Sequence, residues 1–140
     1  MIRRAEAADA GWCARVLGDW VRETGWMPVL HSREEDLGFV AGLIAGAEVW
    51  VAEGGFVVRE GEEVRALYLA PAARGRGVGR ALLDVAKEGR GRLALWAFAA
   101  NAGALRFYAR EGFCEVERTD GAGNEERLPD VRMVWERARG

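Results

Sequence analysis

The sequence predicts one α+β domain, and three of its features lead to this prediction. Short β-rich runs alternate with segments of helical periodicity, which is typical of a sheet flanked by helices. No repeat, low-complexity tract or linker interrupts the alternation, so residues 1–140 are expected to form a single domain. Half of the residues are hydrophobic, and a chain of 140 residues buries roughly two-thirds of its unfolded surface, enough for a core without a disulfide or a metal.

The first part of the chain reads as a short strand followed by two helices. A strand is expected at residues 1–5, and apolar residues then recur on one helical face from Asp9 until the pattern stops at Gly25. Ser32 and Glu35 form a capping box that predicts the start of a second helix. The expected apolar face of this helix consists of Leu37, Val40, Leu43 and Ile44.

Three strands follow the helices. The segments "EVWVAE" (48–53) and "FVVRE" (56–60) are β-rich, and Gly54-Gly55 between them is a two-residue hairpin signal. A further turn at Gly61-Glu62 leads into the strand "EVRALYLA" (63–70).

The last part begins with a glycine-rich loop, a helix at about 77–87 and a strand at 92–98. In the segment 101–112, Asn101 can cap a helix and Gly112 can end it in a left-handed conformation. Strands at 113–119 and 131–137 enclose the polar loop "DGAGNEERLPD". The expected order is therefore β-α-α-β-β-β-α-β-α-β-β.

Composition argues against several classes of protein. A net charge of −2 disfavours a general nucleic-acid binder, which would carry a basic excess. Cys13 and Cys114 lack C-x-x-C spacing, so no zinc or redox site is predicted, and both are expected to be buried free thiols. The chain contains neither a long uncharged apolar run nor a signal-peptide core, so we expect a cytoplasmic protein without a membrane partner.

The segment "PAARGRGVGRALL" (71–83) joins a strand to a helix and predicts an anion site. The first N–H groups of a helix have no intrahelical partners, and the helix dipole adds positive charge there. Glycine lets the backbone approach a phosphate closely, and three arginines, Arg74, Arg76 and Arg80, add guanidinium donors. The segment matches neither the Rossmann fingerprint nor the P-loop, and an exposed turn with solvated arginines is the other interpretation.

Two motifs in this half of the chain resemble those of the GCN5-related N-acetyltransferase (GNAT) superfamily. The core of its acetyl-CoA motif is [QR]-x-x-G-x-[GA], and here Arg74, Gly77 and Gly79 occupy these positions. The pattern N-x-x-A-x-x-F-Y-x-x-x-G-F is matched by Asn101, Ala104, Phe107, Tyr108, Gly112 and Phe113. The resemblance implies an α/β/α-type GNAT fold with a mixed, mostly antiparallel sheet flanked by helices, and acetyl-CoA as co-substrate without a metal.

The resemblance also implies a cofactor site. The pyrophosphate of coenzyme A would lie on the loop and the helix start, and the pantetheine arm would pair with the preceding strand through its main chain. The implied cofactor-binding residues are Leu67, Tyr68, Leu69, Arg74, Gly75, Arg76, Gly77, Val78, Gly79, Arg80 and Asn101. For Asn101, a purely structural role as the N-cap is the alternative.

Acetyl transfer needs a donor for the leaving thiolate and a base for the attacking amine. Tyr108 matches the family's proton donor, unless it only packs beside Phe107. Glu63, His31 or a water chain could serve as the base. Some relatives carry a glutamate five positions before the motif asparagine; Trp96 occupies that position here, so this role is not transferred.

By the same resemblance, the acceptor pocket would involve the loops 24–32 and 120–130. Trp26, His31, Asn124 and Glu125 are the candidate acceptor residues, although Arg127 counts against a purely anionic pocket. We expect acetyl transfer to a primary amine of a small molecule by direct attack in a ternary complex. The alternatives are a protein N-terminus or lysine as acceptor, an acyl-CoA-binding module without turnover and, more remotely, a nucleotide-binding protein. Either a monomer or a homodimer is expected.

Overall fold

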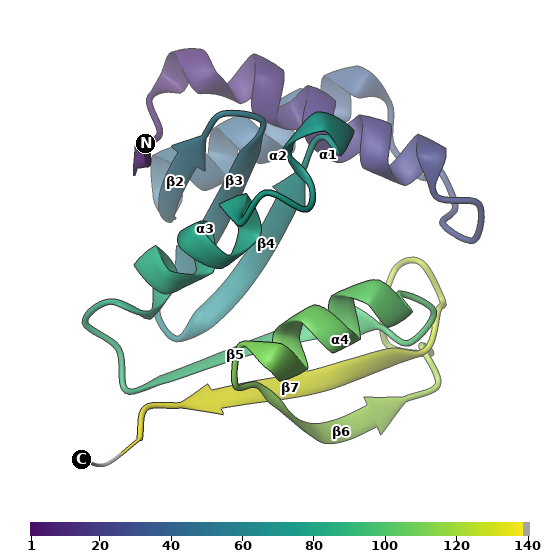
Figure 1. The fold of residues 1–140 in the computed structure, drawn as a ribbon. Helices are drawn as coiled ribbons and strands as arrows, with labels where there is room; N and C mark the ends of the chain where they lie inside the picture. Colours follow the sequence, from purple (N-terminus) through teal and green to yellow (C-terminus); the bar gives the residue numbers. More distant parts are fainter. Residues whose placement is uncertain (139–140) are drawn as a thin grey trace. The chain divides into compact units, whose positions relative to one another are not determined.

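The computed structural model of the chain describes residues 1–138 (Figure 1). It contains two compact units, Met1–Glu88 and Gly89–Gly140, and each is described by itself. The order of helices and strands along the chain is the predicted β-α-α-β-β-β-α-β-α-β-β, with two short 3₁₀ turns, η1 and η2, added.

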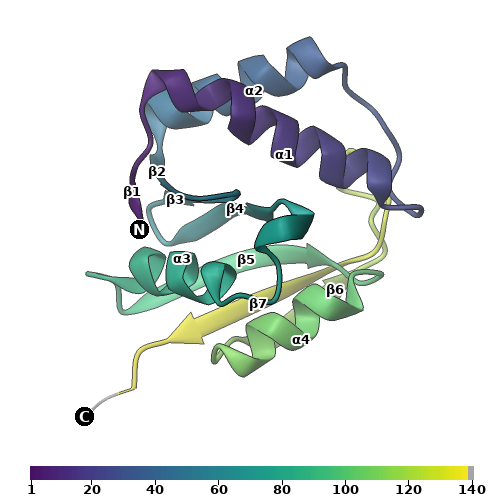
Figure 2. The same cartoon turned by 45° about the horizontal axis from the view of Figure 1, so that its top comes forward.

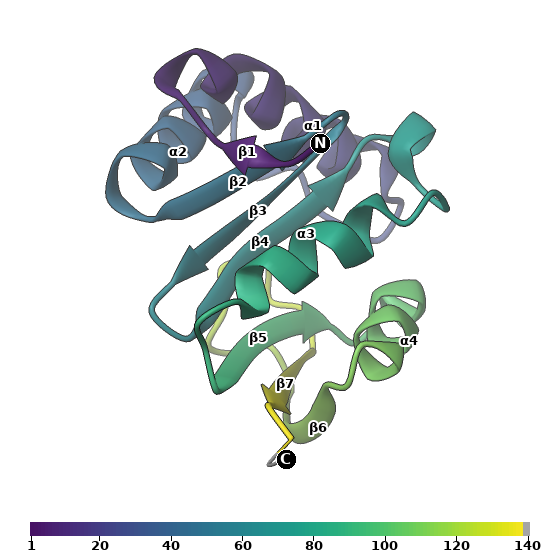
Figure 3. The same ribbon diagram turned by 60° about the vertical axis from the view of Figure 1, so that its left-hand side comes forward.

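The first unit is a four-stranded antiparallel sheet in the order β1-β2-β3-β4. Helices α1 and α2 cover one face of this sheet and α3 covers the other, as Figures 2 and 3 show. The elements of the unit are β1 (Arg3–Arg4), η1 (Ala7–Asp9), α1 (Ala10–Glu23), α2 (Arg33–Gly46), β2 (Glu48–Ala52), β3 (Gly55–Glu60), β4 (Glu63–Leu69), η2 (Pro71–Ala73) and α3 (Val78–Lys87).

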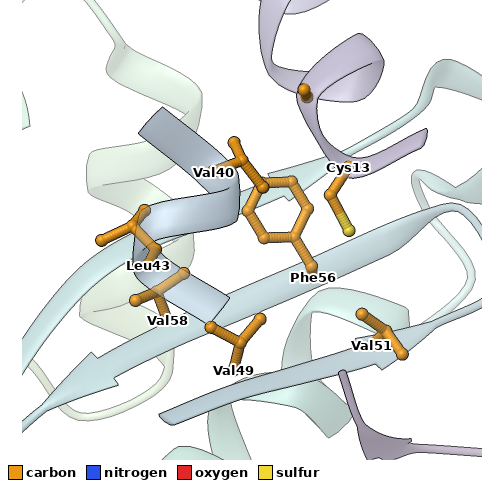
Figure 4. Packing of buried hydrophobic residues seen from close by; sticks show 8 residues of the cluster. Cys13, Val40, Leu43, Val49, Val51, Phe56 and Val58 are labelled. Carbon is orange, nitrogen blue, oxygen red and sulfur yellow. The ribbon is translucent and has the colours of Figure 1, made fainter. Parts of the chain in front are cut away.

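Apolar side chains of β2 and β3 form the core beneath α1 and α2. Phe56 and Cys13 are fully buried. Burial of a large apolar side chain such as that of Phe56 contributes about 1.5–3 kcal/mol to the free energy of unfolding. Figure 4 shows how these side chains meet, namely Cys13, Val40, Leu43, Val49, Val51, Phe56 and Val58. The apolar face of α2 is narrower than predicted, because Leu37 is 44% exposed.

The opposite face of the same sheet is packed against α3. Leu82, Leu83 and Ala86 of this helix are fully buried. Gly55 allows the close approach, because a Cβ at that position would lie 3.3 Å from Leu82 and would overlap Leu69. The sheet therefore holds α3, and with it the glycine-rich loop, through a dense apolar contact.

The second unit is a three-stranded antiparallel sheet in which β7 lies between β5 and β6. Its elements are β5 (Arg92–Phe98), α4 (Ala102–Arg110), β6 (Cys114–Thr119) and β7 (Asp130–Glu136). Gly112 at the end of α4 lies against Trp135 of β7, because a Cβ there would come within 3.1 Å of its ring. Trp135 and the residues that alternate with it on β7 therefore lie on the side of the sheet that faces α4.

The predicted helix caps are confirmed. The Ser32 hydroxyl accepts a hydrogen bond from Glu35 N (3.1 Å), and Ser32 N donates to the Glu35 carboxylate (2.9 Å). Asn101 Oδ1 accepts from Ala104 N at 3.1 Å. Gly112 has φ 94°, the left-handed conformation expected after a helix.

Two predictions about local structure are wrong. The hairpin between β2 and β3 turns at Glu53-Gly54, because Ala52 pairs with Gly55, which belongs to β3. Cys13 is buried as expected, and burial raises the pKa of its thiol to about 12, but Cys114 is exposed. The reason is that β6 pairs only with β7 within its unit, and its residues Cys114–Glu117 are all exposed.

Candidate functional site

The loop between β4 and α3 is an open backbone cradle. Gly75 and Gly77 have φ of 73° and 79°, which favours glycine, and a Cβ built at either position would meet no atom within 4 Å. Gly77 is the N-cap of α3, and the first helical hydrogen bond runs from Ala81 N to Gly77 O at 3.0 Å. The amides that precede Ala81 in the first turn therefore have no helical acceptor and face the loop.

Charge and space at this loop fit a diphosphate. Arg74, Arg76 and Arg80 are exposed around it, and the Arg74 guanidinium donates to Leu69 O at 3.2 Å, which holds its side chain beside the end of β4. The positive end of the α3 dipole adds to these cations. A hollow of about 190 Å³ beside the loop, between α1 and residues 70–74, is lined by Trp12, Trp20 and Arg74 among others.

The strand β4 leads directly into this cradle. Leu67, Tyr68 and Leu69 are half-buried and pair with Val57, Phe56 and Gly55 of β3, respectively. Ala70 N donates to Gly54 O at 2.7 Å, which fixes the end of the strand before the chain turns into η2.

An aromatic chain connects this strand with the loop between α1 and α2. The ring of Trp20 lies 5.3 Å from the ring of Tyr68 and meets Trp26 edge-on at 5.9 Å. Tyr68 in turn lies 5.9 Å from Phe56 in the core. The structure thus brings two predicted site residues, Trp26 and Tyr68, into contact with Trp20, which was not among the predicted site residues.

The two candidate bases of the first unit lie at different places. His31 is exposed before α2, with its Nδ1 3.6 Å from the carboxylate of Glu35. Glu63 is the first residue of β4 and is half-buried. Leu67 lies four positions further along β4, about 13 Å from Glu63, so a proton could pass between Glu63 and Leu67 only through intervening groups or water.

In the second unit, Tyr108 lies on α4 between two aromatic rings. Its ring centroid is 5.2 Å from that of Phe107 and 5.5 Å from that of Phe113, both in edge-on geometry. Asn101 caps the start of the same helix. The packing orients the phenol ring of Tyr108, and a defined orientation is what a proton donor needs.

A hollow of about 560 Å³ lies on this unit, lined by residues of β5, β6, β7 and the loop between β6 and β7. The strand register explains its lining, because Trp96, Arg132 and Glu117 form one row across the sheet and Phe98, Asp130 and Thr119 form the next. The lining residues are Trp96, Ala97, Phe98, Glu117, Thr119, Gly123, Asn124, Glu126 and Asp130.

The loop over this hollow is held by its own hydrogen bonds. Asn124 is in the lining, and its side-chain amide donates to Leu128 O (2.7 Å) and to Asp130 (3.3 Å) while its oxygen accepts from Leu128 N (3.2 Å). Thr119 donates to the other oxygen of Asp130. Gly121 has φ 88°, and any Cβ there would overlap the backbone of Leu128. The hollow is consequently bordered by a loop with a defined conformation, and Asn124 has a structural role within it.

Comparison with known families matches residues 29–115 to the acetyltransferase (GNAT) domain. This chain belongs to the GNAT family. The match includes both motifs that the sequence shares with the family, and membership places the protein among the acetyl-CoA-dependent acyltransferases.

Relatives and solved structures agree with this assignment. The GNAT protein is 31% identical to the peptidyl-lysine N-acetyltransferase YiaC of Escherichia coli over 96% of both chains. It is 36% identical to an uncharacterized N-acetyltransferase of Methanocaldococcus jannaschii over 66% of its own length, but the match spans only 45% of that relative.

The fold is that of solved GNAT structures. Apo YjaB of E. coli superimposes with a TM-score of 0.78 at 25% identity, over 99% of this chain and 98% of the other. YncA of Salmonella typhimurium, solved with its cofactor acetyl-CoA, gives a TM-score of 0.75 at 21% identity over 100% and 95% of the two chains. The predicted α+β fold with a mixed sheet is thereby confirmed.

Of the residues that line this hollow in the GNAT protein, the predicted acceptor residues include only Asn124, and the acidic side chain of Glu117 was missed. Glu117 precedes Thr119 by two residues on a strand, and alternation along the strand could have placed both on one face. Glu125, which the sequence proposed for the acceptor, is not in the lining, whereas its neighbour Glu126 is. Among the described residues, no group of three His, Cys, Asp or Glu side chains could hold a metal, and no helix is both long and apolar enough to cross a membrane.

Proposed function

We propose that this GNAT protein transfers the acetyl group of acetyl-CoA to the primary amine of a small cationic molecule, by direct attack in a ternary complex. We propose further that both units, residues 1–140, act as one acetyltransferase domain. The observation that supports the donor half is the open cradle at Gly75 and Gly77, which leads from β4 into the N-terminus of α3.

Different parts of the chain would bind the pyrophosphate, the pantetheine arm and the leaving sulfur. Backbone N–H groups at the start of α3, with Arg74, Arg76 and Arg80, would bind the pyrophosphate, while the main chain of residues 67–69 would hold the pantetheine arm. Asn101 would add a contact at the start of α4. Tyr108 would donate a hydrogen bond to the leaving sulfur.

The acceptor must lose a proton before it attacks. A lysine-like amine has a pKa of about 10.4 and arrives charged at neutral pH. We propose Glu63, acting through water, as the base, with His31 or a water chain alone as the alternatives. His31 is exposed and Glu63 is half-buried, so each of these side chains is in part accessible to water.

The charge of the hollow in the second unit favours a cationic acceptor. Glu117, Glu126 and Asp130 line it, and within residues 1–138 none of these three carboxylates forms an ion pair with a basic side chain. Arg132, which pairs with Glu117 across β6 and β7, lies over the ring of Trp96 at 5.3 Å. A ligand with a positive charge would compensate these carboxylates. Trp26, His31, Asn124 and Glu125 remain proposed acceptor residues.

A lysine side chain of a protein is the second candidate acceptor. It is favoured by the similarity to YiaC, which is a peptidyl-lysine N-acetyltransferase and matches this chain over almost its whole length. A lysine presents the same cationic primary amine to the hollow, so the chemistry of the carboxylates does not separate the two candidates. Cytoplasmic location and a monomeric or homodimeric state stay predictions.

Two measurements test the proposal. In a thermal-shift titration, acetyl-CoA at about 100 times its Kd should add roughly 2.7 kcal/mol of stability, whereas NAD and ATP should not. Release of free thiol from acetyl-CoA is then followed with monoamines, diamines and a lysine-containing peptide. Turnover with diamines supports the proposed function, and turnover with the peptide alone supports the second candidate. Binding without amine-dependent thiol release would identify a binding module instead of an enzyme.

A further inference from the structure

Arg59 is a buried charged side chain at the far end of α3 from the glycine loop. Only 5% of the residue is exposed, although it carries a permanent positive charge. A buried charge is costly unless it is paired and hydrogen-bonded, so its contacts must compensate it. They do so from two directions, one of which is α3 itself.

The contact with α3 is made at its C-terminus. Arg59 Nη1 donates to Ala86 O at 2.7 Å and to Glu88 O at 2.9 Å. The last carbonyls of a helix lack intrahelical donors, and the helix dipole makes this end negative. The guanidinium thus supplies both the donor and the charge that the end of α3 requires.

The contact with the sheet fixes the guanidinium in place. Nε and Nη2 donate to one oxygen of the Glu48 carboxylate at 3.2 and 2.9 Å. The same guanidinium lies 4.8 Å from the ring centroid of Trp50. Glu48 and Trp50 both belong to β2, while Arg59 belongs to β3, so the side chain is held by two strands before it reaches the helix.

We propose that Arg59 is a positioning residue for coenzyme A binding, because it sets the axis of α3 and thereby the place of the N-terminal amides. The inference depends on the proposed function of the glycine loop. Helix α3 has ten residues and is about 15 Å long. A tilt of about 10° at its C-terminus would therefore move its N-terminus by about 2.5 Å, whereas hydrogen bonds to phosphate tolerate only tenths of an ångström.

The chain offers a matched control for this role. Val58 precedes Arg59 on β3 and is equally buried, but its side chain packs in the core beneath α1 and α2 on the opposite face. Val58→Ala lowers stability by creating a cavity without touching α3. Arg59→Met removes the donors and keeps much of the apolar stem, and Arg59→Lys keeps the charge but loses the fork of donors.

The experiment measures the Kd of coenzyme A by calorimetry for the wild type and the three variants, at a temperature at which circular dichroism shows each to be folded. We expect a Kd about tenfold higher for Arg59→Met, about threefold higher for Arg59→Lys and within twofold of wild type for Val58→Ala. Steady-state kinetics should show the same increase in KM for acetyl-CoA, with the acceptor KM unchanged.

The outcomes separate this inference from the proposed function. If wild-type protein does not bind coenzyme A, the proposed function is wrong and the role of Arg59 falls with it. If wild type binds and Arg59→Met binds equally well, only the positioning role is overturned. Should Arg59→Met not fold, Arg59→Lys decides: a wild-type Kd combined with a Tm lowered as in Val58→Ala would show a purely structural residue.

Discussion

Glu63 and Tyr68 lie on the same face of the β3–β4 pair, although their positions differ by five and strict alternation would place them on opposite faces. The register explains this, because Val58 pairs with Ala66 while Arg59 pairs with Val64, which leaves Arg65 as an extra residue in β4. The bulge thus turns the Glu63 carboxylate to the face where Tyr68 contacts Trp20.

Because Glu63 shares this face with Tyr68, Glu63→Gln is the first test of the proposed base. We expect kcat to fall by at least tenfold and the acidic limb of the pH–rate profile to disappear, because glutamine cannot accept the amine proton. The matched control is Glu62→Gln in the adjoining turn, which should keep both. An unchanged acidic limb in Glu63→Gln would move the base to His31 or to water.

Tyr108→Phe tests the proposed proton donor. The substitution removes only the hydroxyl and keeps the ring contacts with Phe107 and Phe113, so the fold should be unaffected. We expect kcat to fall about 100-fold, within the range of general acid catalysis, while the Kd of acetyl-CoA changes less than threefold. The rate must be measured where chemistry limits turnover. A kcat near that of wild type would remove Tyr108 from the mechanism.

Glu117→Gln tests the acceptor hollow. Loss of one ionic contact at a partly exposed site is worth up to about 1 kcal/mol, so the KM of a diamine should rise about fivefold while that of acetyl-CoA stays constant. Glu115→Gln is the control, because Glu115 pairs with Met133 on the other face of β6 and binds Arg118. Equal effects of both variants on the two substrates would exclude this hollow as the acceptor site.

The hydrogen bonds of the Asp9 carboxylate predict how the free energy of unfolding depends on pH. Arg3 forms two hydrogen bonds with its carboxylate at 2.8 and 2.9 Å, and the Glu6 amide and the Trp12 indole donate to it as well. These donors hold the pKa of Asp9 far below its usual range despite burial. The unfolded chain therefore binds the proton more tightly, and the contribution of Asp9 is complete above its unfolded pKa of about 3.9 and is lost as the pH falls below that.

The corresponding variant is Asp9→Asn. It should lower Tm by about 5 °C at pH 7, but its Tm should fall less than that of wild type between pH 7 and pH 3. Asp84→Asn, at an exposed position on α3, serves as the control and should follow wild type throughout. A wild-type and an Asp9→Asn curve that run parallel down to pH 3 would contradict the assigned role.

The two thiols should react at very different rates. Burial raises the pKa of Cys13 to about 12, and the side chain is inaccessible, whereas Cys114 is exposed. A thiol reagent should label one cysteine in native protein and two in denaturant. Cys114→Ser should abolish the native reaction. Native labelling of Cys13 in that variant would mean that the core beneath α1 opens.

Much of the architecture could be predicted from the sequence, because its signals act over a few residues. The capping box at Ser32 and Glu35, the cap at Asn101 and the left-handed Gly112 each need only their neighbours in the chain. The glycine loop and the tyrosine motif are likewise local patterns, and both are shared with the family.

The sequence by itself determined the order of the elements, the family, and the loop that would hold the cofactor. Each of these depends on the spacing of residues that are close together in the chain. Tertiary structure decided the burial of Arg59, the exposure of Cys114, the position of Glu117 beside Asp130 and the face of Glu63. Each of these depends on strand register, bulges and packing partners distant in the chain, and one extra residue in a strand is enough to turn a side chain to the other face.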